Sequence, residues 1–568
     1  MHDLVIRGGR IIDGTGGAAY EGDVAIEAGR IVSVGEAAGP GRREIDATGL
    51  LVTPGFVDVH THYDGQVSWD RLLEPSIYHG VTTVVMGNCG VGFAPADPQR
   101  HDWLISLMEG VEDIPGTALA EGLTWDWESF PEYLDAIEKG PHTIDFAAQL
   151  PHGALRAYVM GERGADHKEI PSDAELRKMG RLAREAMEAG AVGFSTSRTV
   201  NHKTIDGQHT PSFTATSAEL LGIAEGLREA GRGVFEVVGD FVDLETEFAL
   251  IRQMAEHSGR PLSISVAQLN DRPEDWKRTL ELIEEANADG VRLSAQVAPR
   301  PVGVIMSIES TFNPLVQNAA FGEVKGLPVS ERVARLQDPA LRKRVIEGGM
   351  MMNPSDLFRF DDPPNYEPAA SESIASIAER AGIDPVACAL DIMLEDDGTG
   401  MIFYPALNYI HGNSDHCAEM LLHPHAVPGL GDGGAHVSFI SDASFSTYLL
   451  THWARDRKRG DRLPIEFVIK RQTRDTAELV GFLDRGSLAP GMKADLNVID
   501  FEALKIRRPE MRYDLPAGGK RLVQKAEGYR YTIVSGEVVM DDGVPTGANP
   551  GKLIRGAQPA PTAMTTNC

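Results

Sequence analysis

The central part of the chain alternates between helix-like segments and short apolar runs. The segment SDAELRKMGRLAREAMEAG, which begins at Ser172, carries apolar residues on a helical period and has Ser172 and Glu175 in capping-box spacing. The apolar run AVGFSTS follows it directly. The same order of helix, glycine and strand returns further on, with the strands VFEVV, PLSISVAQ and VRLSAQVAP. Repeated alternation of this kind predicts right-handed crossovers and a parallel sheet.

Eight runs along the chain qualify as strands of that sheet. They are residues 55–60, 81–86, 144–149, 191–196, 234–238, 262–267, 292–297 and 427–432. Eight parallel strands close a TIM-type (β/α)8 barrel, an α/β fold whose active sites lie at the carboxyl ends of the strands. The stretch from about residue 300 to 425 is too long for a βα loop. We therefore expect an insertion there, with helices that lie over the barrel mouth as a candidate substrate lid.

The two ends of the chain share a different pattern. Residues 2–35 read as short alternating or β-branched runs separated by glycine-containing turns, which is typical of a β-meander. ADLNVIDF and YTIVSGEVVMDDG near the other end have the same texture. The sequence therefore predicts one small sheet domain built from residues 1–54 and 481–568, around a barrel of residues 55–480. Two unrelated β edges are the alternative.

Composition narrows the class of protein without indicating its chemistry. The chain has 568 residues, 42% of them hydrophobic and 24% charged, as expected of a globular protein with a large core. Its net charge of −29 argues against nucleic acid or an anionic membrane as partner. Four cysteines without a CxxC pair favour a reducing compartment, and no signal peptide or apolar span is recognisable. We expect a cytoplasmic protein.

Polar residues with metal-binding chemistry follow three of the predicted strands. His60 and His62 close the first strand, and residues two apart in an extended backbone point to the same side, as two ligands of one ion require. Asp432 closes the eighth strand in GLGDGGAHV, where it could bind the ion and also accept a proton from water. Cys89 follows the second strand in MGNCGVG. The alternatives are two polar loop residues, a helix N-cap and an ordinary buried cysteine.

A set of ordered motifs carries a resemblance over nearly the whole chain. GRIIDGTG, PGFVDVHTHYDGQ, GNCG, LPHGALRAYVMG, GAVGFSTS, GDGGAH and DRGSLAPGMKADLNVID are similar to the D-aminoacylase (N-acyl-D-amino-acid deacylase) branch of the amidohydrolase superfamily. The resemblance implies a metal-dependent (β/α) barrel, a β-sandwich built from both termini, and hydrolysis of an amide bond. It places the family's strand-one histidines on His60 and His62, its metal-binding cysteine on Cys89 and its strand-eight aspartate on Asp432.

The sequence departs from the family at strands five and six. The family pattern has a histidine at the end of each, whereas this chain reads VFEVVGD and LSISVAQLN. Val238, Val266 or Ala267 cannot replace an imidazole as a ligand of a second ion. We therefore expect one metal ion, zinc, held by His60, His62 and Asp432 with Cys89 as a possible fourth ligand.

A second departure concerns the substrate. The resemblance implies basic residues after strands six and eight that clamp a carboxylate, but Gln268 stands near the first place and residues 433–454 contain no Lys or Arg. Arg300, Arg198 and the nearby His202 could serve instead, and a structural ion pair at the rim is the alternative for the arginines. His152, in LPHGALR, could contact the substrate carbonyl or a metal ligand, or simply cap a helix.

Three functions fit these residues. The first is hydrolysis of a linear amide, an N-acyl amino acid that could be D-configured, with water activated by the ion and Asp432 as general base. The second is opening of a cyclic amide or lactone, ranked lower because no lysine occurs near the predicted strand ends. The third is a scaffold without activity, against which the retention of His60, His62 and Asp432 argues. The expected partner is a small-molecule substrate, and a homo-oligomer is possible.

Overall fold

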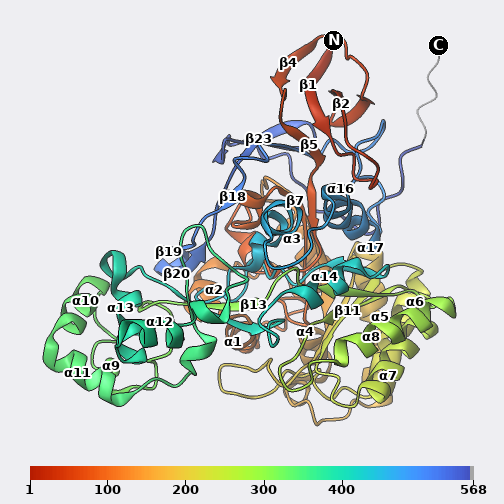
Figure 1. The fold of residues 1–568 in the computed structure, drawn as a ribbon. Coiled ribbons are helices and arrows are strands. Elements are labelled where there is room, and N and C mark those ends of the chain that lie inside the picture. Colours follow the sequence, from red (N-terminus) through yellow and green to blue (C-terminus); the bar gives the residue numbers. More distant parts are fainter. Residues whose placement is uncertain (563–568) are drawn as a thin grey trace.

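A computed structural model describes residues 1–562 of the chain. Figure 1 shows a central α/β body, a sheet formed by the two ends of the chain, and a group of helices to one side. Cys568 lies outside the described residues. Within them, no helix combines the length and the apolar character needed to cross a membrane.

The central body contains the predicted parallel sheet. Its strands are β6 (Phe56–Asp58), β7 (Val81–Met86), β8 (Asp145–Pro151), β9 (Gly193–Arg198), β10 (Val234–Gly239), β11 (Leu262–Val266), β12 (Leu293–Val297) and β16 (Ala426–Pro428). They lie side by side in chain order, and a parallel bridge between Thr61 and Gly433 brings the two edges of the sheet together. The (β/α)8 barrel and its eight strands are confirmed.

Two strand ends differ from the prediction. The first strand stops at Asp58 and the eighth at Pro428, so His60 and Asp432 lie in the loops beyond them. The cause at the eighth strand is local: Leu430 and Asp432 have φ values of 61° and 46°, which a strand cannot contain. The two loops still pair, since Asp432 N donates to His60 O at 3.0 Å.

Helices cover the barrel between its strands, as the sequence pattern predicts. The capping box at the start of α5 is present: Ser172 Oγ accepts from the backbone of Glu175, and the Glu175 carboxylate accepts from the backbone of Ser172 at 2.7 Å. These helices are α4 (His152–Met160), α5 (Asp173–Ala189), α6 (Ser217–Ala230), α7 (Leu244–Ser258), α8 (Asp275–Ala288), α14 (Asp415–Leu422), α15 (Phe445–Tyr448), α16 (Ile465–Lys470) and α17 (Thr476–Leu479).

A long excursion separates β7 from β8. It forms α1 (His101–Glu112), α2 (Gly116–Gly122) and α3 (Phe130–Ile137). The last residue of α1, Glu112, is buried with 1% of its surface exposed. The excursion therefore delivers an acidic side chain into the interior near the carboxyl ends of the strands.

Both ends of the chain contribute to one nine-stranded sheet, which confirms the predicted joint sheet domain. The amino-terminal strands are β1 (His2–Ile11), β2 (Tyr20–Glu27), β3 (Arg30–Val34), β4 (Gly41–Asp46) and β5 (Leu51–Pro54), and the carboxyl-terminal ones are β17 (Leu496–Ile499), β22 (Tyr529–Val534), β23 (Glu537–Asp541) and β24 (Val544–Pro545). The antiparallel pair of β5 and β17 joins the two groups. Two short antiparallel pairs lie in this part of the chain, β18 (Lys505–Ile506) with β21 (Ala526–Glu527) and, between them in sequence, the hairpin of β19 (Glu510–Leu515) and β20 (Gly519–Val523).

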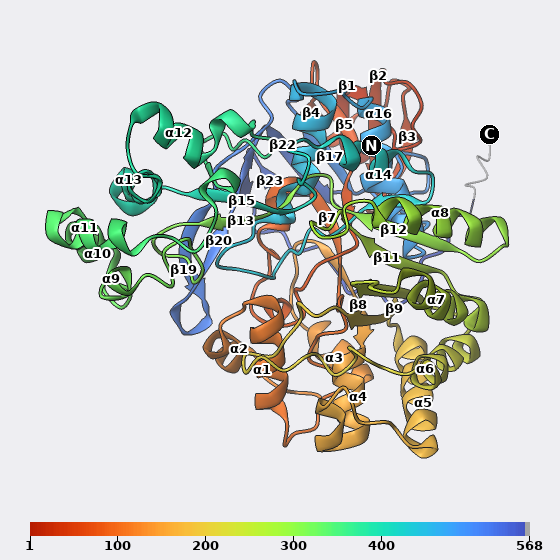
Figure 2. The same cartoon turned by 60° about the horizontal axis from the view of Figure 1, so that its bottom comes forward.

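The predicted insertion forms a unit with its own apolar core. Its elements are β13 (Val302–Met306), α9 (Ala319–Gly322), α10 (Val329–Gln337), α11 (Pro339–Gly348), β14 (Phe358–Arg359), α12 (Ile374–Ala381), α13 (Pro385–Gly398) and β15 (Ile402–Leu407). Figures 1 and 2 show α9 to α13 gathered beside the barrel, so the expectation that these helices lie over its mouth is wrong. They pack on one another instead, and only Val302 and Leu407, at the base of the insertion, line the barrel pocket.

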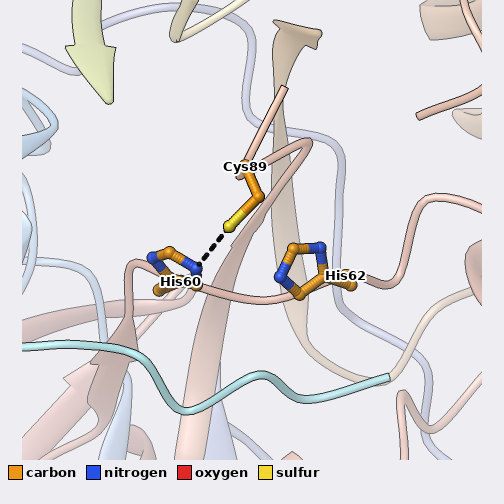
Figure 3. Close-up of side chains that lie close together, drawn as sticks. All are labelled: His60, His62 and Cys89. Carbon is orange, nitrogen blue, oxygen red and sulfur yellow. Dashed lines mark hydrogen bonds between the residues drawn. The ribbon is translucent and has the colours of Figure 1, made fainter. Parts of the chain in front are cut away.

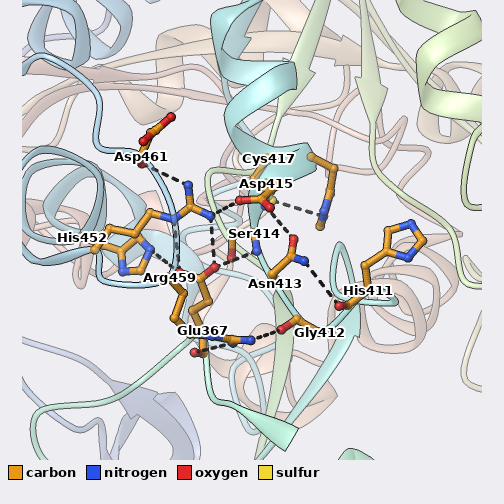
Figure 4. Close-up of polar contacts among 12 residues, drawn as sticks. Glu367, His411, Gly412, Asn413, Ser414, Asp415, Cys417, His452, Arg459 and Asp461 are labelled. Atoms are coloured by element: carbon orange, nitrogen blue, oxygen red, sulfur yellow. Dashed lines mark hydrogen bonds and ion pairs between the residues drawn. The ribbon is translucent and has the colours of Figure 1, made fainter.

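A buried polar cluster ties the insertion to the barrel. The Glu367 carboxylate accepts hydrogen bonds from Ser414 N at 2.8 Å and Arg457 Nη2 at 3.2 Å, and it lies 3.0 Å from His452 Nε2. Arg459 donates to Gly412 O at 2.8 Å, and Figure 4 shows these contacts crossing between the segments. Because charged groups buried together need mutual pairing, the cluster fixes how the insertion leaves and rejoins the barrel.

Candidate metal centre

Four predicted ligand residues meet at the carboxyl ends of neighbouring strands. His60 and His62 follow β6, Cys89 follows β7 and Asp432 follows β16. His60 Nε2 lies 3.3 Å from Cys89 Sγ and 3.4 Å from Asp432 Oδ1, and His62 Nε2 lies 3.5 Å from the same oxygen. Figure 3 shows both imidazoles and the thiol turned toward one point.

These distances suit a tetrahedral ion. Ligand atoms at about 2.0–2.3 Å from a zinc ion are separated from each other by about 3.3–3.8 Å when the geometry is tetrahedral. The observed separations of 3.3, 3.4 and 3.5 Å fall in that range. The donor set of two imidazoles, a carboxylate and a thiol is also one that zinc accepts. The residues therefore fit a single zinc ion.

The imidazole of His60 is oriented by a residue that the sequence pattern did not reveal. Its Nδ1 lies 2.9 Å from Gln296 Oε1 on β12, and an amide oxygen only accepts, so Nδ1 carries the proton. Gln296 is held in turn, since its Nε2 donates to Ser263 Oγ at 2.9 Å. The lone pair on His60 Nε2 is left facing Cys89 and Asp432, as a ligand requires.

His62 has an acidic neighbour on its far side. Its Nδ1 lies 3.3 Å from Glu112 Oε1, at the end of α1, and Glu112 Oε2 lies 3.6 Å from His436 Nε2. Burial lowers the pKa of His62 to about 4, despite the Asp432 carboxylate beside it. The ring is therefore neutral at physiological pH and can act as a ligand. Glu112 was missed because nothing in a 60-residue loop-and-helix excursion marks one glutamate as reaching the site.

The backbone around the site is strained in the way that functional loops often are. Cys89 and Asp432 have φ values of 55° and 46°, although neither is a glycine. The loop after Asp432 also needs its glycines: a Cβ at Gly433 would come within 2.7 Å of Ser76 Oγ, and one at Gly434 within 2.8 Å of His62 O. The DGG sequence thus allows Asp432 to approach the two histidines closely.

Carboxylates are buried around the site without a basic partner. Among the described residues, no Lys or Arg pairs with Asp58, Asp64, Glu112, Glu236 or Asp432. Burial raises the pKa of Asp58 and of Asp64 to about 7, and it also raises the pKa values of Glu112 and Glu236. Burial opposes ionisation of Asp432 too, but its interactions with the adjacent His62 and His60 rings hold its pKa below the usual range. Such an accumulation of buried acids fits a cation at this position.

Glu236 occupies strand five close to the missing histidine. Its Oε2 accepts from Cys89 N at 2.9 Å, and Ser265 Oγ lies 3.5 Å from its Oε1. Burial raises the pKa of the Cys89 thiol, and the negative charge of Glu236 adds to that effect. Glu236 therefore supports the Cys89 loop, a role that no pattern in the sequence predicts.

The ligand cluster lies at the floor of a cavity of about 520 Å³, a size typical of small-molecule sites. Strands β10 and β11 line it with Val238, Gly239, Ser265 and Val266, and the base of the insertion adds Val302 and Leu407. Phe241, Leu269, Trp276, Phe439 and Ile440 complete most of the apolar wall.

The predicted substrate residues divide clearly by position. His202 lines the cavity, with Nδ1 2.9 Å from Ser197 Oγ. The side chains of Arg198, Gln268, Arg300 and His152 do not line it. These four were selected because they follow strands in the sequence, and each turns toward a partner within the fold.

Each of the four has a visible structural role. Arg198 donates to Glu247 at 2.7 Å, and Arg300 donates to Asp442 at 2.9 Å with its guanidinium 3.5 Å from the Tyr366 ring centroid. The backbone of Gln268 donates to Asn408 at 2.6 Å. Both ring nitrogens of His152 are engaged, by Thr196 and by Glu219. The prediction that these residues contact substrate is therefore not supported by their placement.

With the fold and the site described, the class of protein follows. A family model described as the amidohydrolase family matches residues 43–540, so the chain belongs to the amidohydrolase family. An N-acyl-D-glutamate deacylase from Alcaligenes xylosoxydans xylosoxydans is 28% identical, covering 97% of this chain and 96% of its own. An uncharacterized protein from Mycobacterium bovis is 29% identical over 88% of this chain and 84% of its own.

Solved structures give the same result. The crystal structure of N-acyl-D-glutamate deacylase from Bordetella bronchiseptica, complexed with zinc and a phosphonate mimic of the tetrahedral intermediate, has a TM-score of 0.63 at 26% identity, covering 98% of this chain and 99% of that one. A D-aminoacylase structure superposes with a TM-score of 0.65 at 24% identity, covering 98% of this chain and 100% of that one. The predicted resemblance to the D-aminoacylase branch of the amidohydrolases is confirmed.

Proposed function

We propose that this amidohydrolase cleaves a linear N-acyl amide with one zinc ion held by His60, His62, Asp432 and Cys89. The grouping of His60, His62 and Cys89, with Asp432 3.4 Å from His60 and 3.5 Å from His62, carries the proposal. The deacylase relatives support the choice of a linear amide over other bonds. One ion is proposed because Val238 and Val266 stand near the ends of β10 and β11, where a second set of imidazoles would be needed.

The chain's own residues define the proton chemistry. A divalent ion at this position supplies Lewis acidity toward a water molecule and toward the scissile carbonyl. Asp432 is ionised at neutral pH because His62 and His60 lower its pKa, so it can accept a proton from the attacking water. The same carboxyl group then returns the proton to the leaving amine, which departs as a neutral molecule.

The surroundings make that exchange efficient. Gln296 orients the His60 imidazole by a hydrogen bond, and the Glu112 carboxyl group lies 3.3 Å from Nδ1 of His62. The apolar wall excludes bulk water from the floor of the cavity, which strengthens the electrostatic interactions there. His202, which is half-buried and lines the cavity, would contact the substrate in this proposal.

The test begins with metal content. Purified protein dialysed against metal-free buffer should retain about one zinc ion per chain. The zinc-loaded protein is then assayed on N-acyl-D-amino acids, N-acyl-L-amino acids, neutral N-acyl amines, cyclic amides and lactones. Cleavage of linear amides with zinc-dependent turnover supports the proposal. Preferential opening of cyclic substrates, or a chain that binds no metal, would overturn it.

A further inference from the structure

We infer that the substrate carries no free carboxylate on its amine side and presents a neutral, apolar group there instead. This inference rests on the proposed amide hydrolysis and concerns which amides the pocket admits. It derives from the charges and surfaces of the cavity, which contains acids and apolar side chains but no fixed cation.

The first observation is the absence of a positive side chain. Within residues 1–562, none of the side chains that line the cavity belongs to Lys or Arg. The nearby arginines are engaged by acids or carbonyls of the fold: Arg198 pairs with Glu247 and Arg300 with Asp442. Arg272 donates to Phe241 O at 2.9 Å and lies 3.5 Å from the Asp275 carboxylate, so its charge is shared with a lining acid. His202 does not supply a charge, since burial lowers its pKa to about 3.

The second observation is the number of acids facing the same space. The lining residues include Glu109, Glu112, Asp113, Asp240, Asp275 and Asp432. Two of them are fixed in place, since Asp240 accepts from Thr199 Oγ1 at 2.5 Å and from Val200 N at 2.7 Å, and Asp113 accepts from Ser438 N at 3.3 Å. Burial raises the pKa of Glu112 and Asp113, so the acids do not all carry a full charge. A substrate carboxylate would still meet acidic groups without a cationic side chain to pair with, and like charges brought together oppose binding.

The metal ion that we propose at the floor of the cavity does not make the cavity attractive to a second anion. Two of its four ligands, Asp432 and the Cys89 thiolate, are anionic when they bind, so they would offset the charge of a divalent ion. A second anion in the cavity would therefore meet no net positive field. Free carboxylates need a bidentate guanidinium or an ammonium group for strong recognition, and this wall offers neither.

The third observation is the chemistry of the wall itself. Opposite the ligands, Val238, Val266, Leu269 and Trp276 form an apolar surface that continues into Leu407 of the insertion. Such a surface gains free energy by burying an aliphatic or aromatic group. We assign this surface to the amine side of the substrate, which is then an uncharged apolar group.

A matched set of substrates tests the inference. N-acetyl-2-phenylethylamine, N-acetyl-D-phenylalanine and N-acetyl-L-phenylalanine share the acyl group and the ring, and only the last two carry a carboxylate. We expect kcat/KM of the zinc-loaded enzyme to be at least about tenfold higher for the neutral amide than for either acid. Equal or faster cleavage of an acid overturns this inference but leaves the amide hydrolase intact. Failure to cleave all three, together with the wider panel, overturns the proposed function as well.

A designed cation provides the second measurement. Leu269→Arg places a guanidinium in the wall, and Leu269→Met changes shape without charge. We expect Leu269→Arg to shift the ratio of kcat/KM values toward the acids by about fivefold or more, whereas Leu269→Met keeps the wild-type preference. If Leu269→Arg does not fold, Leu407→Lys with Leu407→Met makes the same comparison from the insertion. An unchanged ratio in a folded cationic variant would contradict the inference.

Discussion

The two sides of the barrel mouth differ sharply in what their strand ends carry. On one side, the loops after β6 and β7 gather His60, His62 and Cys89, and the loop after β16 brings Asp432 within 3.4–3.5 Å of the two histidines. On the other, β10 and β11 end in valines and glycine that line the cavity. In the proposed function, the first group of strand ends holds the metal ion and the second contacts the substrate.

This difference shows how one barrel can keep its reaction centre while its substrate specificity changes. Ligand positions need polar side chains, strained loops and buried partners such as Gln296 and Glu112. β10 and β11 face the cavity without these structural requirements, so their residues can vary and determine substrate specificity. The predictions below compare matched changes on the two sides.

The largest expected effect is loss of turnover in Asp432→Asn. The amide cannot accept a proton, so kcat should fall by about 10²–10⁴-fold while the fold and most of the zinc remain. The matched control on the other side is Asp240→Asn, which should change kcat by less than about tenfold because Asp240 is bonded to Thr199 and the Val200 backbone. Equal losses in the two variants, measured at saturating substrate, would remove the distinction between the two sides.

A metal-binding comparison comes next. Cys89→Ala removes a proposed ligand, and zinc affinity measured by competition with a chelator should fall by more than the roughly 10–100-fold typical of outer contacts. Val266→Ala, on the apolar side, should leave zinc affinity unchanged while lowering kcat/KM. Wild-type affinity in Cys89→Ala would show that the thiol is not a ligand and that the ion has three protein ligands.

An outer contact on the ligand side should have a smaller effect. Gln296→Ala frees Nδ1 of His60, which then loses its fixed orientation. Zinc affinity should drop by about 10–100-fold, with partial recovery in Gln296→Glu because a carboxylate can also accept from Nδ1. Identical affinities for the alanine and glutamate variants would indicate that Gln296 acts only through packing.

The sequence predicted the ligand side better than the substrate side, and the reason is physical. His60 and His62 carry their own signal, since two imidazoles after a buried strand have few other uses. Glu112 arrives from a helix in a long excursion, and Gln296 reads as an ordinary strand residue, so only the fold brings them to the site. Arg300 follows strand seven as a substrate residue could, but it turns into a cage of Tyr366, Phe445 and Tyr448.

The insertion marks the same limit. The length of the insertion could be predicted from the sequence, but its position beside the barrel could not. The apolar residues of α10 to α13 pack on one another, and their pattern in the sequence does not distinguish this from packing over the barrel mouth. Local periodicity specifies that a helix has an apolar face without specifying what covers it. The joint terminal sheet, in which β5 pairs with β17, could be predicted because both ends of the chain show the same short alternating runs separated by glycine-containing turns.

The smallest predicted effect concerns stability on the ligand side, at the amino end of β7. His79 is fully buried, with Nε2 3.1 Å from Gln524 O and Nδ1 2.8 Å from Thr447 Oγ1. A carbonyl oxygen only accepts, so Nε2 carries the proton and the neutral ring is the form that the fold holds. Burial accordingly lowers the pKa of His79 to about 3.

Below about pH 6.5 the unfolded chain binds a proton at His79, whereas the native chain does not until the pH approaches 3. The contribution of His79 to the free energy of unfolding should therefore be complete above about pH 6.5 and decrease as the pH falls toward 3. In the metal-free protein, His79→Gln should remove up to about 1.4 kcal/mol per pH unit of this dependence between pH 6 and 4. The measurement is the urea midpoint at each pH, with the slopes against pH compared between the wild type and His79→Gln. A slope in His79→Gln that matches the wild type would mean that this histidine does not anchor the ligand side through its neutral form.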